Sequence, residues 1–333
     1  MTVFVTGGAG YIGSHAVPAL LEAGQDVLVL DDLSTGRRGA VPQGVEFVHG
    51  DVGDEGLVQA VLEGGRSIDA VMHFAAFIEV EESVREPIKY YSNNVEKSLA
   101  LIRACLRAGI ESFVFSSSAA VYGFQEHSPV TEQTRASPTN PYGMSKLMTE
   151  WMLRDAAAAN ESFNYIILRY FNVAGADPLQ RAGASAPDAT HLIRVACQAA
   201  LGLRDGIDVY GNDYPTRDGT CVRDFIHVSD IASAHVAALD HLLRGGKSMV
   251  LNCGYGSGYS VKEVLDTVDR VAGVRLKRRD APRRPGDVAE LVADATLIRE
   301  RLNWRPRHQD LDTIIGSALA WERRLAANAP PMP

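Results

Sequence analysis

The sequence has few of the features that mark secreted, membrane-spanning or metal-binding proteins. Only four of its 333 residues are cysteines, and no two lie close enough in sequence for a CxxC pair or a zinc motif. No run of about 18 apolar residues could span a bilayer, and the chain opens on an apolar strand rather than on a leader segment. We therefore expect a cytoplasmic protein with no metal site, no membrane partner and buried, unpaired cysteines.

Basic residues are also in the minority. Lys and Arg number 33 against 41 Asp and Glu, which gives a net charge of −8. A nucleic-acid backbone recruits basic surfaces, so this balance argues against nucleic acid as a partner. A small anionic ligand is compatible with it, because such a ligand needs only a local group of arginines.

Strand and helix patterns alternate through the first half of the chain. Strands are expected at 2–6, 26–30, 45–48, 69–72, 112–116 and 163–168, and helices at 12–23, 54–63, 88–108 and 143–159. This alternation predicts an α/β fold with a doubly wound, Rossmann-like parallel sheet. Beyond Tyr170 the pattern is less regular, with helices at 229–243, 260–272 and 308–325. We expect a domain over 1–172 and a smaller α/β lobe, mainly 173–328, with chain crossings back to the first domain.

A glycine-rich turn follows the first expected strand. Gly7, Gly10 and Gly13 fit G-x-x-G-x-x-G, and G-x-G-x-x-G begins at Gly8, between a strand and a helix as a dinucleotide loop requires. Glycines let the backbone approach a pyrophosphate, and the helix start offers unpaired N–H groups. Asp31 ends the second strand, where a carboxylate binds ribose hydroxyls and repels a 2′-phosphate. The first domain is therefore predicted to bind NAD rather than NADP.

A tyrosine and a lysine stand four residues apart, which places Tyr142 and Lys146 on one helix face. Lowering a tyrosine pKa from about 10 to about 7 takes roughly 4 kcal/mol. We expect the positive charges of Lys146 and of the oxidised NAD ring to supply this free energy by stabilising the phenolate, which would make Tyr142 a base. Ser118 ends a Ser116–Ser118 run after the fifth strand, at the sheet edge where ligands bind. A lone Y-x-x-x-K is also common on solvated helices, but this combination favours hydride transfer.

These three features together resemble the extended short-chain dehydrogenase/reductase family. Further segments are similar to the UDP-glucose 4-epimerases of that family, namely 73–76, 90–95, 116–123, 138–143, 169–175, 210–228 and 284–287. The resemblance covers residues 2 to about 325, and the segment 210–228 is its most specific part.

The resemblance implies an NAD-dependent isomerase of galactose and carbohydrate metabolism that interconverts UDP-glucose and UDP-galactose. Tyr142 would take the proton of the sugar 4-hydroxyl, with Ser118 hydrogen-bonded to the same oxygen, while hydride passes from C4 to NAD. The 4-keto sugar would then swing about its diphosphate linkage and receive the hydride on its other face. The resemblance also implies a homodimer, in which the helices at 88–108 and 143–159 of two copies form a four-helix bundle. The alternative is that these helices pack only on the chain's own sheet.

The resemblance assigns three groups of site residues. The catalytic residues would be Ser118, Tyr142 and Lys146. NAD contacts would come from Gly7, Gly10, Tyr11, Ile12, Gly13, Asp31, Asp32, Asp51, Val52, Phe74, Ala75, Ala76, Asn94, Ser116, Tyr142, Lys146 and Tyr170. Substrate contacts would come from Ser118, Tyr142, Asn172, His191, Leu192, Tyr210, Arg223, Arg284, Asp287 and Leu291. Arginine suits a diphosphate because it binds in a bidentate manner, although each arginine taken singly could equally form a surface salt bridge.

Four positions depart from the best-known members of the family. Ile78 replaces a lysine that can contact the cofactor phosphates, and Ala120 replaces a threonine of the serine run. His191 stands where an asparagine is found, and it could equally be a solvent-facing residue at a helix start. Leu291 stands where some epimerases carry a tyrosine, so the sugar pocket could have room for a 2-acetamido group.

Related activities share the fold. Nucleotide-sugar 4,6-dehydratases carry an acidic group in the run that reads Ser118-Ala119-Ala120 here, so dehydration is not expected. Epimerases acting on UDP-N-acetylhexosamines, UDP-pentoses or UDP-uronates stay as alternatives. A catalytically silent NAD-sensing protein is disfavoured, because such proteins often lose the tyrosine or the lysine and both are present here.

Overall fold

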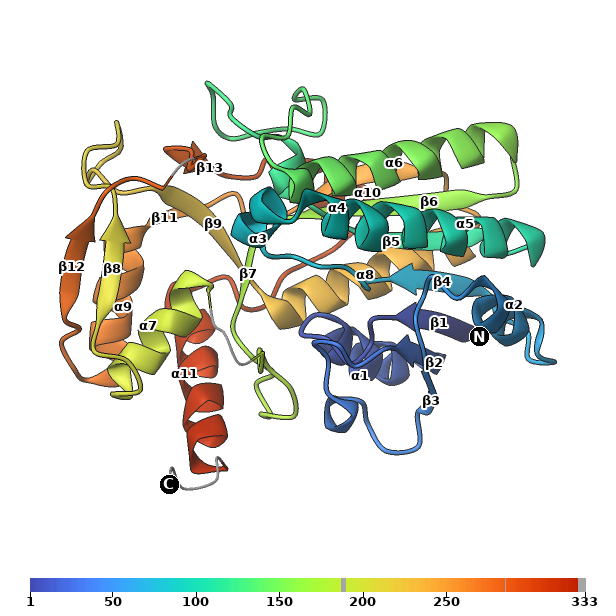
Figure 1. Cartoon of the computed structure of the whole chain (residues 1–333), viewed down its shortest axis with the longest axis horizontal. Helices are drawn as coiled ribbons and strands as arrows, with labels where there is room; N and C mark the ends of the chain where they lie inside the picture. The colour runs from blue at the N-terminus through green and yellow to red at the C-terminus, as the bar shows by residue number, and fades with distance from the viewer. Residues whose placement is uncertain (187–189, 285, 329–333) are drawn as a thin grey trace.

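The computed structural model describes residues 1–186, 190–284 and 286–328. Within these ranges a seven-stranded parallel sheet has the order β10-β6-β5-β4-β1-β2-β3 (Figure 1). Its strands are β1 (Thr2–Thr6), β2 (Asp26–Asp31), β3 (Glu46–His49), β4 (Ala70–His73), β5 (Ser112–Ser118), β6 (Asn164–Tyr170) and β10 (Met249–Cys253). The predicted α/β fold with a large parallel sheet is confirmed.

Helices cover both faces of this sheet (Figure 1). One face carries α1 (Gly13–Glu22) and α8 (Val228–Leu243), and the other carries α2 (Glu55–Glu63), α5 (Lys97–Arg107) and α6 (Pro141–Ala159). In β1, Val3 and Val5 belong to the hydrophobic cluster that includes Leu20 of α1, whereas Phe4 belongs to the cluster that includes Leu101 of α5. Because both faces are buried, the strands read as nearly continuous apolar runs.

Short helices connect the sheet to its covering layer. After β4 the chain forms α3 (Val80–Arg85) and α4 (Pro87–Tyr90), then a π-helical turn over Tyr91–Glu96 that leads directly into α5. The helix expected at 88–108 is therefore an α4–π–α5 run. Two 3₁₀ turns, Arg38–Ala40 and Ala119–Val121, follow β2 and β5.

The remaining elements form a second lobe. A small sheet contains β7 (Asn172–Ala174), β9 (Val222–His227), β11 (Gly258–Ser260) and β13 (Glu290–Leu291), and β8 (Ile207–Tyr210) pairs with β12 (Arg278–Ala281). Helices α7 (Leu192–Ala200), α9 (Val261–Ala272) and α11 (Leu311–Ala327) pack together, and α10 (Thr296–Leu302) lies beside β10. The strands in 205–224 were not expected from the sequence, because they pair with segments far away in the chain.

The chain returns from the second lobe to the main sheet. Helix α8 packs on β5 and β6, and β10 pairs with β6 at the sheet edge. The two units are thus interleaved in sequence, and the limits 1–172 and 173–328 stay predictions.

The four cysteines are buried and free of disulfides, as expected from the sequence. Across 1–186, 190–284 and 286–328, no helix is long and apolar enough to cross a membrane. The same ranges hold no group of three or more His, Cys, Asp or Glu residues placed to bind a metal ion.

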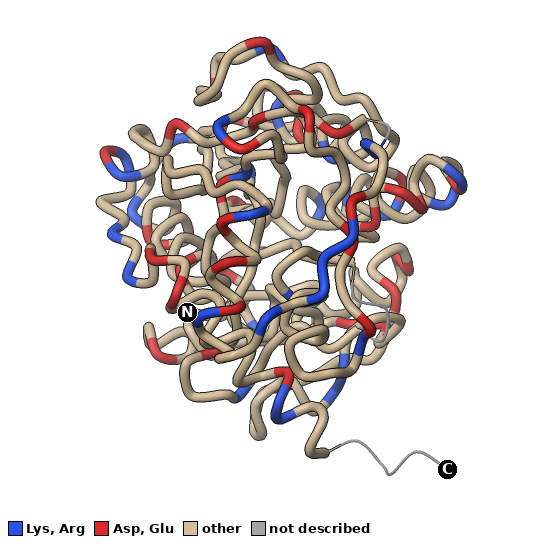
Figure 2. The backbone as a smooth tube through the Cα atoms, turned by 90° about the vertical axis from the view of Figure 1, so that its left-hand side faces the viewer, with Lys and Arg blue, Asp and Glu red and all other residues tan. Residues whose placement is uncertain are grey.

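Acidic and basic residues are interspersed along the backbone rather than separated into faces (Figure 2). Even the basic β12 segment is paired with acids, since Lys277 bonds Asp205 and Arg279 bonds Asp208. The basic residues of this segment are therefore held in local ion pairs.

Three buried histidines should make the fold sensitive to mild acid. Burial lowers the pKa of His73 and His227 to about 3 and that of His235 to about 4. The unfolded chain binds these protons near pH 6.5, so the stability is present above that pH and is lost as the pH falls toward 4. We expect a loss of about 1.4 kcal/mol per pH unit for each histidine. Urea unfolding measures the free energy of unfolding between pH 7.5 and 5. A free energy that does not change over this range would contradict the prediction.

Candidate active site

The glycine loop leaves no room for side chains. A Cβ atom on Gly13 would lie 2.2 Å from the Gly7 carbonyl oxygen, and one on Gly7, at φ +74°, would lie 2.5 Å from the Ala75 nitrogen. Ile12 precedes helix α1 without a side-chain cap on its first turn, so backbone N–H groups are available to an anion there. The Tyr11 hydroxyl donates to the Gly175 carbonyl (2.6 Å) and ties the loop to the second lobe. This cradle fits a pyrophosphate.

Asp31 lies at the carboxyl end of β2, beside the glycine loop. Its Oδ2 accepts from the Ala9 N–H (2.8 Å) and its Oδ1 from the Leu33 N–H (2.9 Å). Burial raises the pKa of this carboxyl group. The next residue, Asp32, is exposed and accepts from Ser34. Asp31 therefore lies where an acidic residue would bind the ribose of a dinucleotide.

Asp51 follows β3 and forms an ion pair with Lys97 (2.5 Å). Burial acts to raise its pKa, but the hydrogen bond from Lys97, a second one from the Gly53 N–H and the lysine charge together lower it. The neighbouring Val52 is buried. Lys97 was not expected from the sequence, and nothing in the local pattern around it points to Asp51.

The segment after β4 is held in place by Asn94. This buried side chain accepts from the Phe77 N–H (2.9 Å) and donates to the Phe77 carbonyl (3.0 Å). It also donates to the Ser145 hydroxyl of helix α6 (3.0 Å). The Phe74 ring packs against His235, with 4.6 Å between the ring centroids. Phe74, Ala75 and Ala76 are thus fixed between the glycine loop and α6.

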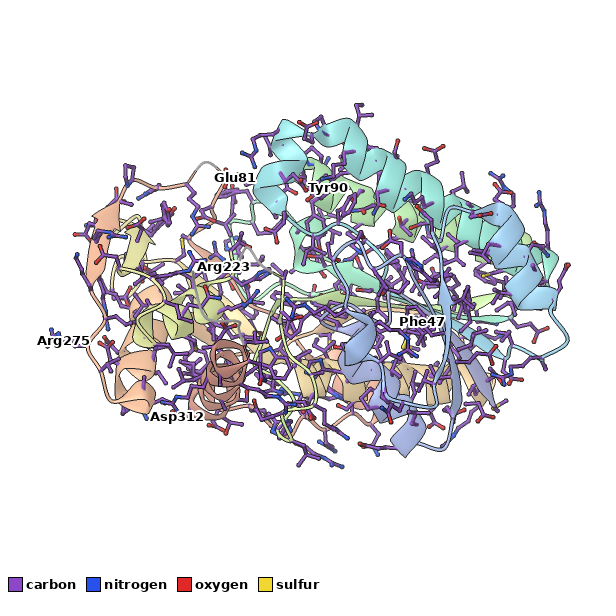
Figure 3. All side chains as sticks on the ribbon, turned by 60° about the horizontal axis from the view of Figure 1, so that its bottom comes forward. Phe47, Glu81, Tyr90, Arg223, Arg275 and Asp312 are labelled. Carbon is purple, nitrogen blue, oxygen red and sulfur yellow. The ribbon has the colours of Figure 1, made fainter. Side chains whose placement is uncertain are left out.

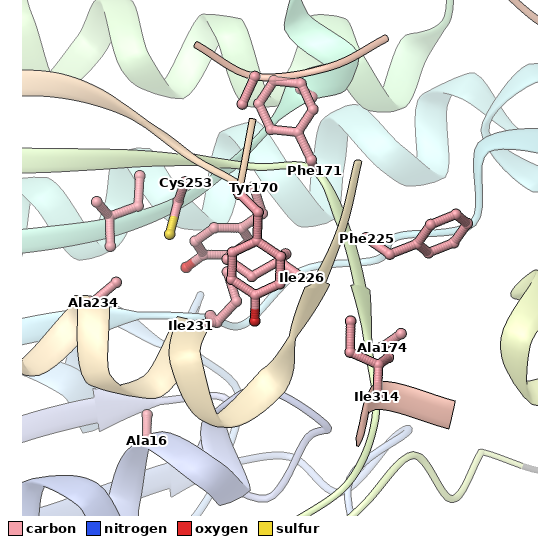
Figure 4. Packing of buried hydrophobic residues seen from close by; sticks show 14 of the residues in the cluster. Ala16, Tyr170, Phe171, Ala174, Phe225, Ile226, Ile231, Ala234, Cys253 and Ile314 are labelled. Atoms are coloured by element: carbon pink, nitrogen blue, oxygen red, sulfur yellow. The ribbon is translucent and has the colours of Figure 1, made fainter. Parts of the chain in front are cut away.

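Tyr170 ends β6 within the hydrophobic cluster that Figure 4 shows around Cys253 and Ile231. His235 Nδ1 faces the Ile231 carbonyl (2.9 Å) and must donate to it, so its Nε2 accepts from the Tyr170 hydroxyl. Burial raises the Tyr170 pKa well above its usual value, while a hydrogen bond with Ser116 acts to lower it. Tyr170 is therefore a neutral, oriented phenol.

The three residues predicted to be catalytic are brought together. Ser118 is the last residue of β5, and the first turn of α6, which carries Tyr142, packs closely on the turn that follows it: a Cβ on Gly143 would lie 2.5 Å from the Ala120 carbonyl oxygen. Lys146, one turn later, is buried and donates from Nζ to the Ser116 carbonyl (2.9 Å). Its ammonium lies 5.1 Å from the centre of the Phe115 ring. The helix cap at Asn140, whose Oδ1 accepts from Gly143 (2.8 Å), fixes the turn that carries Tyr142.

Burial has the largest effect on the pKa values of Tyr142 and Lys146. The protein's own groups raise the Tyr142 pKa: burial is the largest cause, the Ser118 hydrogen bond acts to lower it, and the charge of Glu79 raises it further. Burial lowers the pKa of Lys146 to about 7, against the Glu150 charge, which raises it. The expectation that Lys146 and the NAD ring together acidify Tyr142 therefore stays a prediction, and among the protein's own groups burial has the larger effect, in the opposite direction.

A buried ion pair that the sequence did not suggest lies behind the catalytic residues. Glu150 accepts from Arg169 Nε and Nη2 (3.0 and 2.6 Å) and from the Ser117 hydroxyl (2.5 Å). Ser117 and Arg169 face each other in the β5–β6 register. The available signal was spacing, because Glu150 follows Lys146 by one helical turn.

The residues expected to contact the UDP portion lie in the second lobe. Arg223 of β9 is 3.5 Å from Asp287, and Leu291 of β13 is paired in register with Arg223. The Arg284 guanidinium stacks on the Tyr210 ring at 4.0 Å. Figure 3 shows Arg223 near the middle of the molecule, whereas Arg275 projects from the outer end of this lobe.

The two lobes also meet at the start of α7. His191 precedes this helix, Leu192 begins it, and His191 is exposed. The adjacent Thr190 donates to Glu79 Oε2 (2.9 Å), which stands before α3 in the first domain. Asn172 begins β7 and pairs in register with Phe225 of β9, close to the chain crossing.

Comparisons with known proteins agree with this geometry. Residues 3–254 match the family described as the NAD dependent epimerase/dehydratase family. A UDP-glucose 4-epimerase from Azospirillum brasilense is 57% identical and covers 97% of this chain and 92% of that protein.

Two solved structures are also similar. A UDP-glucose-4-epimerase from Stenotrophomonas maltophila, with bound NAD and formylated UDP-arabinopyranose, is 41% identical with a TM-score of 0.95 and covers 99% of this chain and 100% of that one. A UDP-Glc/GlcNAc 4-epimerase from Campylobacter jejuni is 47% identical with a TM-score of 0.86, covering 97% and 99%.

The chain belongs to the NAD dependent epimerase/dehydratase family. The resemblance read from the motifs is thereby confirmed, as is the NAD-dependent epimerase class. The roles of the individual site residues stay predictions. The structure places two of the departures: Ile78 is 48% exposed, and the backbone N–H of Ala120 donates to Ser118 Oγ (3.2 Å).

Gly13→Ala should prevent the epimerase from holding its dinucleotide. The added methyl group would lie within 3 Å of Gly7 and Gly8 backbone atoms, so the loop must open. We expect NAD affinity to fall at least about 100-fold, which is about 2.7 kcal/mol, as measured by calorimetry. Gly39→Ala is the control, because a Cβ there meets nothing within 4 Å. Equal NAD affinity in both variants would contradict the assignment.

Proposed function

We propose that the protein interconverts UDP-glucose and UDP-galactose by NAD-dependent oxidation and reduction at C4. The observation that carries this proposal is the placement of Tyr142 and Lys146 on one face of α6, with Lys146 bonded to the Ser116 carbonyl and the first turn of α6 packed on the turn after Ser118, at the sheet edge that the glycine loop shares. The identity of 57% to a UDP-glucose 4-epimerase supports the substrate.

Each residue has a role that follows from its position. Tyr142 takes the proton of the sugar 4-hydroxyl and later returns it, while Ser118 holds the same oxygen by a hydrogen bond. Lys146 is held by the Ser116 carbonyl, and in its protonated form it places a positive charge near the phenolate as that charge develops. Arg223 and Arg284 hold the diphosphate through bidentate contacts. Inversion requires the sugar to turn, so firm binding of UDP must accompany loose binding of the sugar.

The residues that would hold NAD are those around the glycine loop, with Asp31 at the ribose and Tyr170 and Lys146 at the nicotinamide end. NAD supplies the hydride acceptor and a positive ring that favours the Tyr142 phenolate. The protein's own groups raise the Tyr142 pKa, so this proposal assigns the lowering of that pKa to the holoenzyme.

The proposal is tested by incubating the NAD-loaded protein with UDP-galactose and identifying the product. UDP-glucose should accumulate to equilibrium with no net reduction of NAD. Absence of UDP-glucose, with the protein folded and NAD bound, would overturn the proposal.

A second candidate substrate class is the UDP-N-acetylhexosamines. Leu291 lies next to Arg223 in the β13–β9 register, and the similar Campylobacter jejuni protein is described as a UDP-Glc/GlcNAc 4-epimerase. Leu291→Tyr should cut activity on UDP-N-acetylglucosamine at least about tenfold, since overfilling a packed pocket costs roughly 1–3 kcal/mol. Activity on UDP-galactose should fall less. Product analysis with both sugars measures the two activities. Equal losses of activity on the two sugars would show that residue 291 does not set the size of the sugar pocket.

We further propose a homodimer in the cytoplasm. Ile88 (73% exposed), Leu99 (41%) and Trp151 (44%) place apolar side chains at the surface of α4, α5 and α6. Such a patch on neighbouring helices favours pairing with a second copy, and unpaired cysteines favour a reducing compartment. Sedimentation of the wild type and of a Leu99→Glu variant tests the dimer, and an unchanged sedimentation rate would contradict it.

A further inference from the structure

We propose that Glu79 is a specificity-determining residue that selects neutral sugars and rejects sugars carrying a carboxylate, such as UDP-uronates. This inference rests on the proposed function and narrows its substrate class. It is carried by where Glu79 lies, between the start of α6 and the start of α7.

The backbone of Glu79 is firmly placed. It is the residue before α3, and its carbonyl accepts from the Ser83 N–H (3.0 Å) in the first turn of that helix. Helix α3 packs against α6, whose first turn carries Tyr142. The packing of α3 therefore holds the backbone of Glu79 close to the catalytic helix.

The side chain of Glu79 reaches across to the second lobe. Its Oε2 accepts from the Thr190 hydroxyl (2.9 Å), although the two residues are 111 positions apart in the chain. Thr190 is next to His191, a position expected to contact substrate. The hydrogen bond orients the carboxylate toward the start of α7, where His191 is expected to contact substrate.

The charge of Glu79 interacts electrostatically with the catalytic tyrosine. Burial is the main cause of the raised Tyr142 pKa, and the negative charge of Glu79 adds to it. Glu79 also interacts with His191, the residue that follows its hydrogen-bond partner Thr190. The carboxylate is thus close enough to interact with charge on either side of the sugar.

A carboxylate on the sugar would meet this charge. C6 is attached to C5, the neighbour of C4, so a C6 carboxylate must come near Tyr142 whichever face of the sugar is presented. Two negative charges a few ångströms apart near a protein surface repel strongly. A hydroxymethyl group carries no charge and can donate a hydrogen bond to a carboxylate instead. The sign of the Glu79 charge therefore favours hexoses over uronates.

The test compares Glu79→Gln with Glu81→Gln, a matched control. Glu81 lies two residues further along, is exposed, and is labelled on α3 in Figure 3. For each variant, kcat/KM is measured on UDP-galactose and UDP-glucuronate. We expect Glu79→Gln to raise the ratio of UDP-glucuronate to UDP-galactose activity about tenfold. The control should leave this ratio within about twofold of the wild type, as a distant surface charge would.

A binding measurement keeps the inference separate from the proposed function. Calorimetry gives the Kd of UDP-glucuronate and of UDP-glucose for the wild type, Glu79→Gln and Glu79→Ala. If the wild type does not epimerise UDP-galactose, the proposed function fails. The ratio of the Kd of UDP-glucuronate to that of UDP-glucose still tests whether Glu79 disfavours a sugar carboxylate. A ratio unchanged in both Glu79 variants overturns the inference. A ratio that shifts toward UDP-glucuronate in either folded variant, and shifts less at high salt, supports it.

Discussion

Replacing Tyr142 with phenylalanine is expected to reduce kcat for UDP-galactose about 1000-fold, within the 10²–10⁴ that general acid–base catalysis contributes. The change removes only the phenolic hydroxyl, whose pKa Ser118 acts to lower against the larger effect of burial. Without it, no protein group on this turn of α6 can take the proton of the 4-hydroxyl, because Lys146 is engaged with the Ser116 carbonyl. Steady-state kinetics with product identification measure the loss.

Binding should change little in the Tyr142 variant, since the phenol ring stays. Calorimetry with NAD and with UDP should give affinities within about threefold of the wild type, as for a change that removes a transition-state interaction only. Tyr165→Phe is the matched control, because Tyr165 lies near the amino end of β6, away from the catalytic edge. Retention of more than about a tenth of wild-type kcat in Tyr142→Phe would refute Tyr142 as the base.

Replacing Glu150 with glutamine is expected to lower the free energy of unfolding by about 3 kcal/mol or more. Both partners of the Glu150–Arg169 pair are buried, and Arg169 donates to the carboxylate through two nitrogens. The substitution keeps the shape but leaves a buried guanidinium without a counter-charge, and that is what costs stability. Urea unfolding at pH 7.5 measures the change.

The control is Asp312→Asn, which breaks a surface pair with Arg270. Exposed pairs contribute about 0–1 kcal/mol, so this variant should unfold close to the wild type. In the double variant Glu150→Gln/Arg169→Met no charge is left unpaired, and part of the lost stability should return. If the Glu150 and Asp312 variants lower the free energy of unfolding by the same amount, the buried pair contributes no more to stability than the surface pair.

The Glu150 variant should also affect catalysis, because it removes two supports of the active site. Its carboxylate holds Ser117, the neighbour of Ser118, and its charge raises the pKa of Lys146. Removing that charge lowers the Lys146 pKa further, so the loss of the remaining activity on raising the pH should begin at a lower pH than in the wild type. A pH profile distinguishes this effect from a loss of folded protein.

Much of the site could be predicted from the sequence because its signals are local. The glycines at 7, 10 and 13 are dictated by steric contacts within one turn, and the face shared by Tyr142 and Lys146 follows from helical periodicity. The motif segments were long enough to identify the family. The strands of the first domain were also found, because each is a short apolar run bounded by turn residues.

What the sequence by itself determined was the alternation of strands and helices in the first domain, the glycine loop and the shared helix face of Tyr142 and Lys146, all of which depend on neighbours within a few residues. The tertiary structure alone decided which groups set the charge around that triplet. Glu150 reaches Arg169 through the β5–β6 register, and Glu79 reaches Thr190 across the two lobes. Desolvation likewise turned Lys146 from an expected permanent cation into a group with a pKa of about 7. Burial and long-range pairing belong to the folded chain, so no spacing rule could supply them.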